Sequence, residues 1–172
     1  MTESKTEFKD LNLLPSILKA LNEKGYTKPT PIQEKSISSL LNGDDLLGIA
    51  QTGTGKTAAF SLPIINRLGK NKVKVKPKHV RALIITPTRE LASQIDENVK
   101  AYAKGLNLFS TVIFGGVGKS KQINRLNSGV DILIATPGRL LDLMNEGYIK
   151  YNQLEVFVLD EADRMLDMGF IN

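Results

Sequence analysis

An alternation of short apolar runs with helical patterns is the feature that most constrains how this chain folds. Five runs have the length of a buried strand, and a helical pattern or helix start follows each: Leu46–Ala50, Val80–Thr86, Phe109–Phe114, Asp131–Ala135 and Val156–Leu159. Strands that alternate with helices are joined by right-handed crossovers, which produce a mostly parallel sheet. The sequence therefore predicts an α/β fold in which helices flank both faces of the sheet.

Two helices are predicted before the first apolar run. One extends from about Leu13 to Lys24, and Gly25 ends it. The other begins at a capping box in which Thr30 is the N-cap and Gln33 reaches back to it. The Gln33 amide also offers the donor and acceptor that would pair with adenine. The residues alone leave the structural and the adenine-binding interpretations open.

Length and composition exclude several classes of protein. The chain has 172 residues, about one domain, with 41% hydrophobic and 24% charged residues, as in soluble globular proteins. It has no cysteine, which excludes disulfides and thiolate metal sites and favours a cytoplasmic location. No apolar stretch approaches the roughly 18 residues of a membrane span, so no membrane partner is expected. The net charge of +5 is compatible with a polyanionic partner but does not require one.

The segment Ala50–Thr57 has the composition and the context of a phosphate-binding loop. It follows an apolar run and precedes a helical pattern, and it differs from the strict P-loop pattern only at Ala50. Glycines at 53 and 55 allow successive backbone N–H groups to point inward at a polyphosphate. Lys56 would reach the β and γ phosphates, and the Thr57 hydroxyl would hold Mg²⁺.

A pair of carboxylates closes the last apolar run. Asp160 and Glu161 follow Leu159 directly, at the carboxyl end of a predicted strand. In a chain with a P-loop this pattern indicates a Walker B element, in which Asp160 holds the metal and Glu161 positions the attacking water. Without the P-loop the same acids would only decorate a helix start, where negative charge is favoured.

Two Thr-Pro steps each close a strand, open a helix and place an arginine in its first turn. The arginines are Arg89 and Arg139. A cation at a helix N-terminus opposes the helix dipole unless an anion binds there, and a nucleic-acid phosphate fits that role. Alternatively, each arginine turns away to a surface carboxylate. The lysine-rich segment 70–78 is interpreted as a solvated loop rather than a nucleic-acid patch.

Taken together, these segments resemble the DEAD-box family of ATP-dependent RNA helicases along essentially the whole chain. Gly25–Gln33 is similar to the Q motif of that family, Ala50–Thr57 to motif I and Pro87–Ala92 to motif Ia. The remaining matches are Gly115-Gly116, Gln122 with Arg125, Thr136–Arg139 and Asp160–Asp163. Asp163–Phe170 resembles the bacterial RhlE-type branch.

The resemblance implies a role for each matched residue. Lys56, Asp160 and Glu161 would be catalytic, Thr57 and Asp160 would hold Mg²⁺ through water, and Asp163 would couple two domains. The ATP-binding residues would be Phe8, Tyr26, Lys28, Gln33, Ala50, Gln51, Thr52, Gly53, Thr54, Gly55, Lys56 and Thr57. RNA would be held by its backbone, without sequence preference, on Pro87, Thr88, Arg89, Gly115, Gly116, Gln122, Arg125, Thr136, Pro137, Gly138 and Arg139.

The resemblance also implies that the chain is one part of a larger helicase. We expect N-terminal helices with the Q motif over residues 1–34, and an incomplete RecA-like P-loop domain over residues 35–172. The Ser-Ala-Thr motif of the family and its second RecA-like domain do not occur in this sequence. We therefore expect nucleotide binding with little hydrolysis. Two other functions stay open: a P-loop ATPase that acts on DNA or protein, and a binding module without catalysis.

Overall fold

A computed structural model describes residues 6–49 and 53–170. The chain divides into two compact units, Met1–Lys72 with Asn98–Asn107, and Val73–Glu97 with Leu108–Asn172. Each unit is described separately below. Within the described ranges, no helix combines the length and the apolar character needed to cross a membrane.

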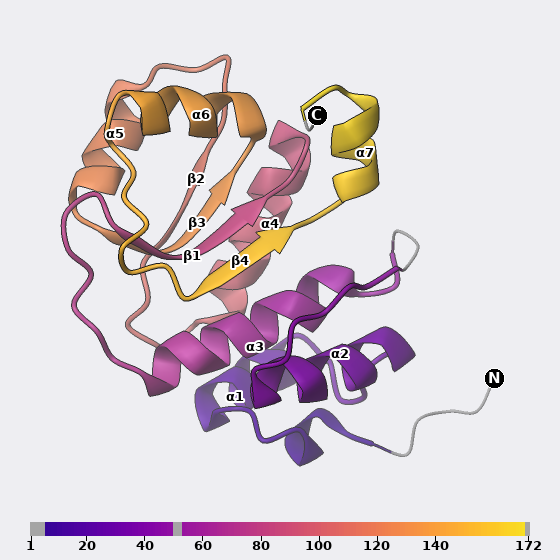
Figure 1. Ribbon diagram of the computed structural model, residues 1–172. Helices are drawn as coiled ribbons and strands as arrows, with labels where there is room; N and C mark the ends of the chain where they lie inside the picture. Colours follow the sequence, from indigo (N-terminus) through magenta and orange to yellow (C-terminus); the bar gives the residue numbers. More distant parts are fainter. Residues whose placement is uncertain (1–5, 50–52, 171–172) are drawn as a thin grey trace. The chain divides into compact units, whose positions relative to one another are not determined.

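The first unit is helical in its described part. It contains a short 3-10 helix, η1 (Phe8–Asp10), and the helices α1 (Pro15–Glu23), α2 (Pro31–Asn42) and α3 (Lys56–Lys70) (Figure 1). The predicted first helix is confirmed with slightly shorter bounds, and Gly25 follows it with a φ of +75°. Such a backbone conformation carries no steric cost at glycine, so the chain turns sharply there.

The predicted strand at Leu46–Ala50 is not found in the described residues. Residues 46–49 have no strand partner, and Leu47 and Ile49 are 92% and 93% exposed. Ala50 lies outside the described residues. The prediction is therefore wrong for residues 46–49: the apolar composition is typical of a strand, but a strand also needs a neighbour for its backbone hydrogen bonds. The four strands of the described chain all lie in the second unit.

The second unit is built on a parallel sheet. Its strands are β1 (Val80–Ile85), β2 (Ser110–Ile113), β3 (Val130–Ala135) and β4 (Val156–Leu159), in the order β2-β3-β1-β4. Every pairing is parallel; Leu83, for example, lies between Leu133 and Phe157. The helices are α4 (Arg89–Tyr102), which belongs to this unit as far as Glu97, α5 (Ser120–Asn127), α6 (Pro137–Asn145) and α7 (Ala162–Asp167). The predicted α/β class is confirmed.

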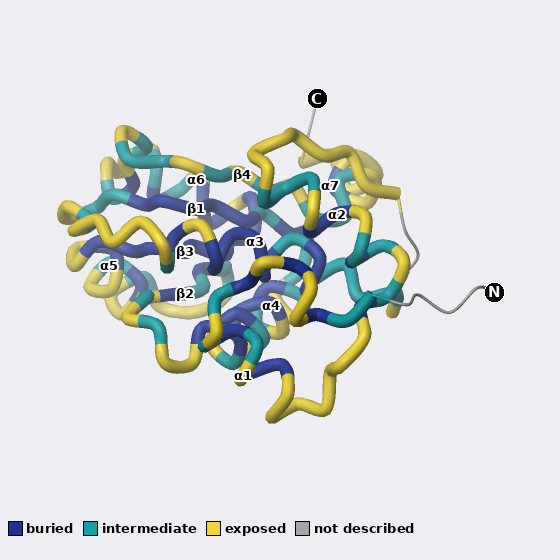
Figure 2. Tube along the Cα trace, turned by 90° about the horizontal axis from the view of Figure 1, so that it is seen from below, coloured by how far each residue is buried: buried dark blue, intermediate teal, exposed yellow. Residues whose placement is uncertain are grey.

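Helices lie on both sides of the sheet, as predicted. Residues of α5 and α6 pack with β1 and β3 on one face around Leu83, Leu133 and Leu143. The first part of α4 lies on the other side of the sheet from α6 (Figures 1 and 2). The strands β1 and β3 are the most buried segments of this unit, whereas β4, at the edge, alternates between partly buried and exposed residues. The core therefore lies around the two central strands.

A buried arginine, Arg81, connects β1 with β3 and with the residue just before β4, at the amino ends of these strands. Arg81 of β1 is only 1% exposed, and its Nε donates to Oε1 of Glu155 at 2.7 Å. Its Nη1 donates to Oδ1 of Asp131, in β3, at 3.1 Å. The other oxygen of Asp131 accepts the N–H of Phe109, just before β2, at 2.9 Å. Because a buried charge is costly without partners, these carboxylates are required for Arg81 to stay inside the fold.

We expect Asp131→Ala to destabilise the protein by about 3 kcal/mol, because it leaves Arg81 with part of its charge unpaired in the interior. Urea unfolding followed by circular dichroism measures this change. Glu23→Ala is the control, since its pair with Lys104 is solvent-exposed and should contribute little to stability. Equal costs for the two variants would contradict the assigned role of the buried pair.

Candidate functional site

The phosphate loop lies in the first unit, immediately before α3. Gly53 and Gly55 have φ values of +81° and +89°, and Gly55 is the N-cap of α3. Lys56 and Thr57 are the first residues of the helix, where free backbone N–H groups and the helix dipole attract anions. Ala50, Gln51 and Thr52 lie outside the described residues. The described part of the loop thus has the backbone that a polyphosphate site requires.

The side chains of the predicted capping box contact this loop. The N–H of Thr30 donates to Oε1 of Gln33 at 3.0 Å, and the N–H of Gln33 donates to Oγ1 of Thr30 at 3.4 Å, so the capping box is confirmed. Thr30 Oγ1 also donates to the Thr54 carbonyl at 2.9 Å, and Gln33 Nε2 to the Gly55 carbonyl at 3.1 Å. Gln33 therefore couples the start of α2 to the phosphate loop. Its adenine-binding role stays a prediction.

The other predicted base-pocket residues lie on the segment before α2. The N–H of Phe8 donates to the Thr27 carbonyl at 3.1 Å, and the Phe8 ring is buried. Tyr26 and Lys28 are exposed. The backbone of this segment is therefore held by η1, and the side chain of Tyr26, which is predicted to line the base pocket, is accessible to a ligand.

The predicted catalytic carboxylates lie in the second unit, between β4 and α7. The N–H of Asp160 donates to the Ile85 carbonyl at 2.8 Å, which extends the pairing of β4 with β1 by one residue. Glu161 is the N-cap of α7 and has a φ of +54°, an unusual conformation for a residue with a side chain. Its Oε2 accepts from Arg164 Nη1 at 3.3 Å, and Asp163 is exposed in the first turn of α7. Strained backbone of this kind is often found at functional sites.

Acidic and histidine side chains do not form a metal-binding cluster in the described part of the chain: no group of three or more is found there. The residues predicted to hold Mg²⁺ are Thr57, in the first unit, and Asp160, in the second. A hydroxyl and one carboxylate suit an ion that keeps several water ligands and is bound largely by substrate phosphates. The donor chemistry therefore fits Mg²⁺ bound together with a nucleotide.

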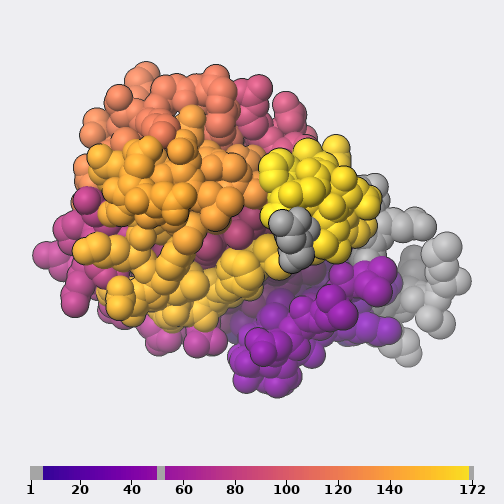
Figure 3. Space-filling model, turned by 45° about the horizontal axis from the view of Figure 1, so that its top comes forward, coloured from indigo at the N-terminus to yellow at the C-terminus, as the bar shows by residue number. Residues whose placement is uncertain are grey.

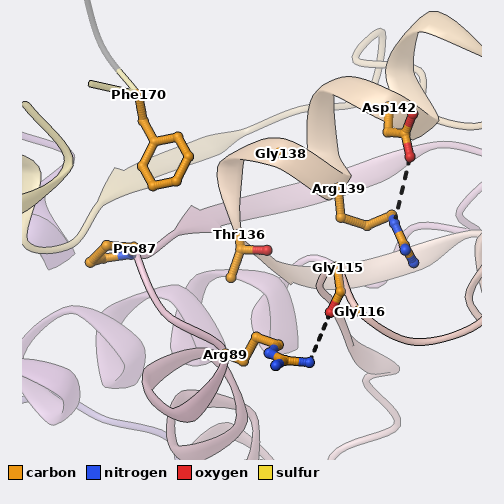
Figure 4. Close-up of a pocket in the computed structure, with 9 residues that line it drawn as sticks. All are labelled: Pro87, Arg89, Gly115, Gly116, Thr136, Gly138, Arg139, Asp142 and Phe170. Carbon is orange, nitrogen blue, oxygen red and sulfur yellow. Dashed lines mark hydrogen bonds and ion pairs between the residues drawn. The ribbon is translucent and has the colours of Figure 1, made fainter. Parts of the chain in front are cut away.

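A pocket of about 420 Å³ opens in the second unit where β1, β2 and β3 end (Figure 4). Parallel strands bring the loops at their carboxyl ends to one edge of the sheet, which is where ligands of open α/β sheets bind. Most of the lining comes from residues predicted to bind RNA, on three separate loops. The lining residues are Pro87, Arg89, Gly115, Gly116, Thr136, Gly138, Arg139, Asp142 and Phe170.

The two predicted arginines both line this pocket. Arg89 is exposed, and its Nη1 donates to the Gly115 carbonyl at 3.2 Å. Arg139 is buried; its Nη2 donates to the Val117 carbonyl at 3.0 Å, and its Nε lies 3.7 Å from Oδ2 of Asp142. The alternative interpretation, in which each arginine turns to a carboxylate, thus holds in part for Arg139 and not for Arg89, and phosphate binding by either arginine stays a prediction. Nη1 of Arg139 is buried without a hydrogen-bond partner.

Asp142 offsets only part of the positive charge of the pocket, because Arg89, Arg139 and Lys119 outnumber the carboxylates of Asp142 and Glu146. Lys119 Nζ lies 2.8 Å from Oδ2 of Asp142 and 2.6 Å from Oε1 of Glu146. Lys119 donates hydrogen bonds to Asp142 and Glu146, and these bonds raise the pKa of Lys119, so the lysine stays charged at neutral pH. Neither Asp142 nor Lys119 was predicted from the sequence, because only the α5–α6 arrangement brings them together.

The remaining predicted RNA-binding residues do not line the pocket. Gln122 Nε2 donates to the Phe114 carbonyl at 3.1 Å, and Arg125 Nη1 donates to Oγ1 of Thr111 at 3.3 Å. Oγ1 of Thr88 accepts the Leu91 N–H at 3.3 Å, at the start of α4, and Pro137 is the first residue of α6. These contacts position the loops that line the pocket.

Comparison with known proteins agrees with this geometry. A family model described as "DEAD/DEAH box helicase" matches residues 30–172. Among curated proteins, the DEAD-box ATP-dependent RNA helicase RhpA of Helicobacter pylori (strain B128) is 48% identical, over 98% of this chain and 33% of its own length. The ATP-dependent RNA helicase DeaD of Escherichia coli (strain K12) is 46% identical, over 99% of this chain and 27% of its own length.

A solved structure is also similar. The crystal structure of a DEAD box protein from the hyperthermophile Methanococcus jannaschii superposes with a TM-score of 0.88 at 40% sequence identity. The match covers 99% of this chain and 45% of that one. The chain therefore spans less than half of the length of these similar proteins.

We expect Gly116→Ala to lower the free energy of unfolding by about 1 kcal/mol, because Gly116 has a φ of +77°. The added Cβ would also lie 2.5 Å from Arg89 Nη1 and displace that side chain. Gly115→Ala is the matched control, since its Cβ would meet nothing within 4 Å. Chemical denaturation of both variants tests the prediction, and an equal loss in the two would contradict it.

Proposed function

The chain belongs to the DEAD/DEAH box helicase family, and from this premise we propose that the full protein remodels RNA duplexes in cycles of ATP binding and hydrolysis. The observation that carries the proposal is the pocket in the second unit, where Arg89 and Arg139 from two helix starts face one cavity. Guanidinium groups beside helix N-termini suit the phosphates of a nucleic-acid backbone.

In this proposal the first unit supplies the nucleotide site. The loop Gly53–Gly55 and the start of α3 hold the phosphates in this proposal, with Lys56 on the β and γ groups. Tyr26, Phe8 and the backbone near Lys28 form the base pocket. Gln33 distinguishes adenine from guanine through its amide. Its hydrogen bond to the Gly55 carbonyl links this amide to the phosphate loop.

Hydrolysis needs the carboxylates as well. Thr57 and Asp160 would hold Mg²⁺ through water, and this ion would neutralise charge on the phosphates. Glu161 orients the attacking water and accepts its proton, and Asp163 couples hydrolysis to domain movement. The left-handed backbone of Glu161 and its contact with Arg164 support a fixed carboxylate position.

RNA lies along the pocket at the carboxyl ends of β1, β2 and β3. Contacts from arginines, backbone N–H groups and glycine loops bind phosphates and carry no base information, so we expect no sequence preference. Gln122 and Arg125 also contact RNA in this proposal, and they hydrogen-bond to the Phe114 carbonyl after β2 and to Thr111 in β2.

A second RecA-like domain of the same full protein completes the ATP site in this proposal. An arginine supplied to the transferring phosphate is worth roughly 10³ to 10⁵ in rate, so the 172-residue chain alone should bind nucleotide and hydrolyse it slowly. We also propose that the protein belongs to the RhlE-type branch, on the basis of Asp163–Phe170, and that it acts in the cytoplasm.

Nucleotide selectivity tests the first unit. Calorimetric titration of the chain with ADP and GDP in the presence of Mg²⁺ should show a clear preference for ADP, on the order of tenfold or more. Gln33→Ala should remove this preference because the adenine-reading amide is lost. Lys35→Ala, an exposed position on α2, is the control and should retain it. Equal binding of ADP and GDP by the unchanged chain would reduce Gln33 to a helix-capping role.

RNA-stimulated ATP hydrolysis by the full protein tests the assigned catalysis. Glu161→Gln should retain ATP binding and lower the turnover rate on the order of 100-fold, because an amide cannot accept the proton of the attacking water. Asp167→Asn, an exposed carboxylate of the same helix, should have little effect. Full turnover in Glu161→Gln, or equal stimulation by DNA of the same sequence, would contradict the proposal.

A further inference from the structure

One residue of the pocket was not predicted to bind anything. Phe170 lines the cavity together with Arg89, Arg139 and Gly138, and its side chain is 43% exposed. In the close-up its ring points toward the space between Pro87 and Thr136 (Figure 4). In the space-filling view the segment that follows β4 forms a lobe at the surface of the second unit (Figure 3). The pocket thus has one large aromatic wall that is accessible to a ligand.

The backbone around Phe170 is held in place by the end of α7. Gly169 has a φ of +74°, and its N–H donates to the Leu166 carbonyl at 2.9 Å. The N–H of Phe170 donates to the Met165 carbonyl at 3.0 Å. These two bonds form the Schellman arrangement that ends many helices. Met165 is buried, so this helix end is anchored to the body of the unit and the ring projects from a defined position.

Position in the pocket distinguishes Phe170 from the other exposed aromatic residues of this unit. Phe157, on the edge strand β4, is 53% exposed but does not line the cavity. Around Phe170 the cavity combines two guanidinium groups with an apolar wall made by Pro87 and the phenyl ring. The cationic groups suit phosphates, whereas the wall made by Pro87 and Phe170 suits an apolar surface of the ligand.

The backbone of a nucleic acid offers this combination in a fixed order. Each ribose joins two phosphates and presents a face of C–H groups, which can pack on an aromatic ring. In a strand whose phosphates lie on the arginines, a sugar is the apolar group that joins those phosphates and that fits against this wall. A base has no fixed place in such an arrangement, because backbone-bound strands leave their bases free of the protein.

We propose that Phe170 is an RNA-contact residue whose ring packs against a ribose of the bound strand. The inference rests on the proposed function, since it requires RNA in this pocket. It adds an apolar contact to a track otherwise made of charged and backbone groups, and this contact is independent of base sequence and of salt.

The test is the affinity of the full protein for a short fluorescent single-stranded RNA, with a non-hydrolysable ATP analogue present. Phe170→Ala should weaken binding roughly fivefold, as expected for the loss of one modest apolar contact. Phe170→Tyr should restore most of the affinity, and Phe157→Ala should leave it unchanged. The dependence of affinity on salt should have the same slope in Phe170→Ala as in the unaltered protein, because no phosphate contact is removed.

An oligonucleotide without bases identifies the part of the RNA that touches the ring. If Phe170 packs on a ribose, Phe170→Ala loses about the same factor on abasic RNA as on normal RNA. A loss that disappears on abasic RNA would overturn the ribose assignment in favour of base stacking. Equal losses in Phe170→Ala and Phe157→Ala, or no loss in Phe170→Ala, would overturn the proposal. Unchanged binding of the ATP analogue and an unchanged melting temperature establish that each variant is folded.

Arg89→Ala separates failure of this inference from failure of the proposed function. Arg89 is exposed, so its removal should not disturb the fold, and it should reduce the salt slope by about 1 if Arg89 binds a phosphate. Weaker RNA binding in Arg89→Ala with unchanged binding in Phe170→Ala would overturn only the role of Phe170. Unchanged binding in both variants would show that RNA does not bind in this pocket, and it would overturn both proposals.

Discussion

The buried charge of Arg81 is the constraint on which the second unit depends. Its guanidinium needs Asp131 from β3 and Glu155 from the approach to β4, and Asp131 in turn holds the chain just before β2. Arg81 thereby connects β1, β3 and the approach to β4, and Asp131 extends the connection to the segment before β2. A buried cation of this kind tolerates only the arrangement that supplies its partners, so the order β2-β3-β1-β4 and the positions of the strand ends are set together.

The position of the pocket follows from that sheet. Because the strands are parallel and in register, the loops after β1, β2 and β3 open at one edge, and the short connections after β1 and β3 each lead into a helix start with an arginine. The glycines after β2 allow Arg89 to lie against the backbone, where a side chain at position 116 would collide with it. The pocket therefore combines glycine backbone and two cations, which suit a polyanion, with an apolar wall and one carboxylate.

Much of this could be predicted from the sequence because the signals are local. The strands β1, β3 and β4 were predicted to within a residue or two from apolar runs, and the capping box at Thr30 was predicted from spacing alone. The run at Leu46–Ala50 shows the limit of this reasoning, since apolar composition does not supply a pairing partner. The pairing of Lys119 with Asp142 and the place of Phe170 in the pocket had no local signal, because residues distant in sequence create them.

The sequence by itself determined the α/β class, the phosphate loop, the acidic strand end and the family, because each depends on residue types at short spacing. Only the tertiary structure decided which predicted RNA-binding residues share a cavity and which, like Gln122 and Arg125, lie outside its lining. It also decided that Arg139 is buried beside Asp142 while Arg89 stays exposed. The physical reason is that burial and charge pairing are set by neighbours from other strands and helices, which no short segment specifies.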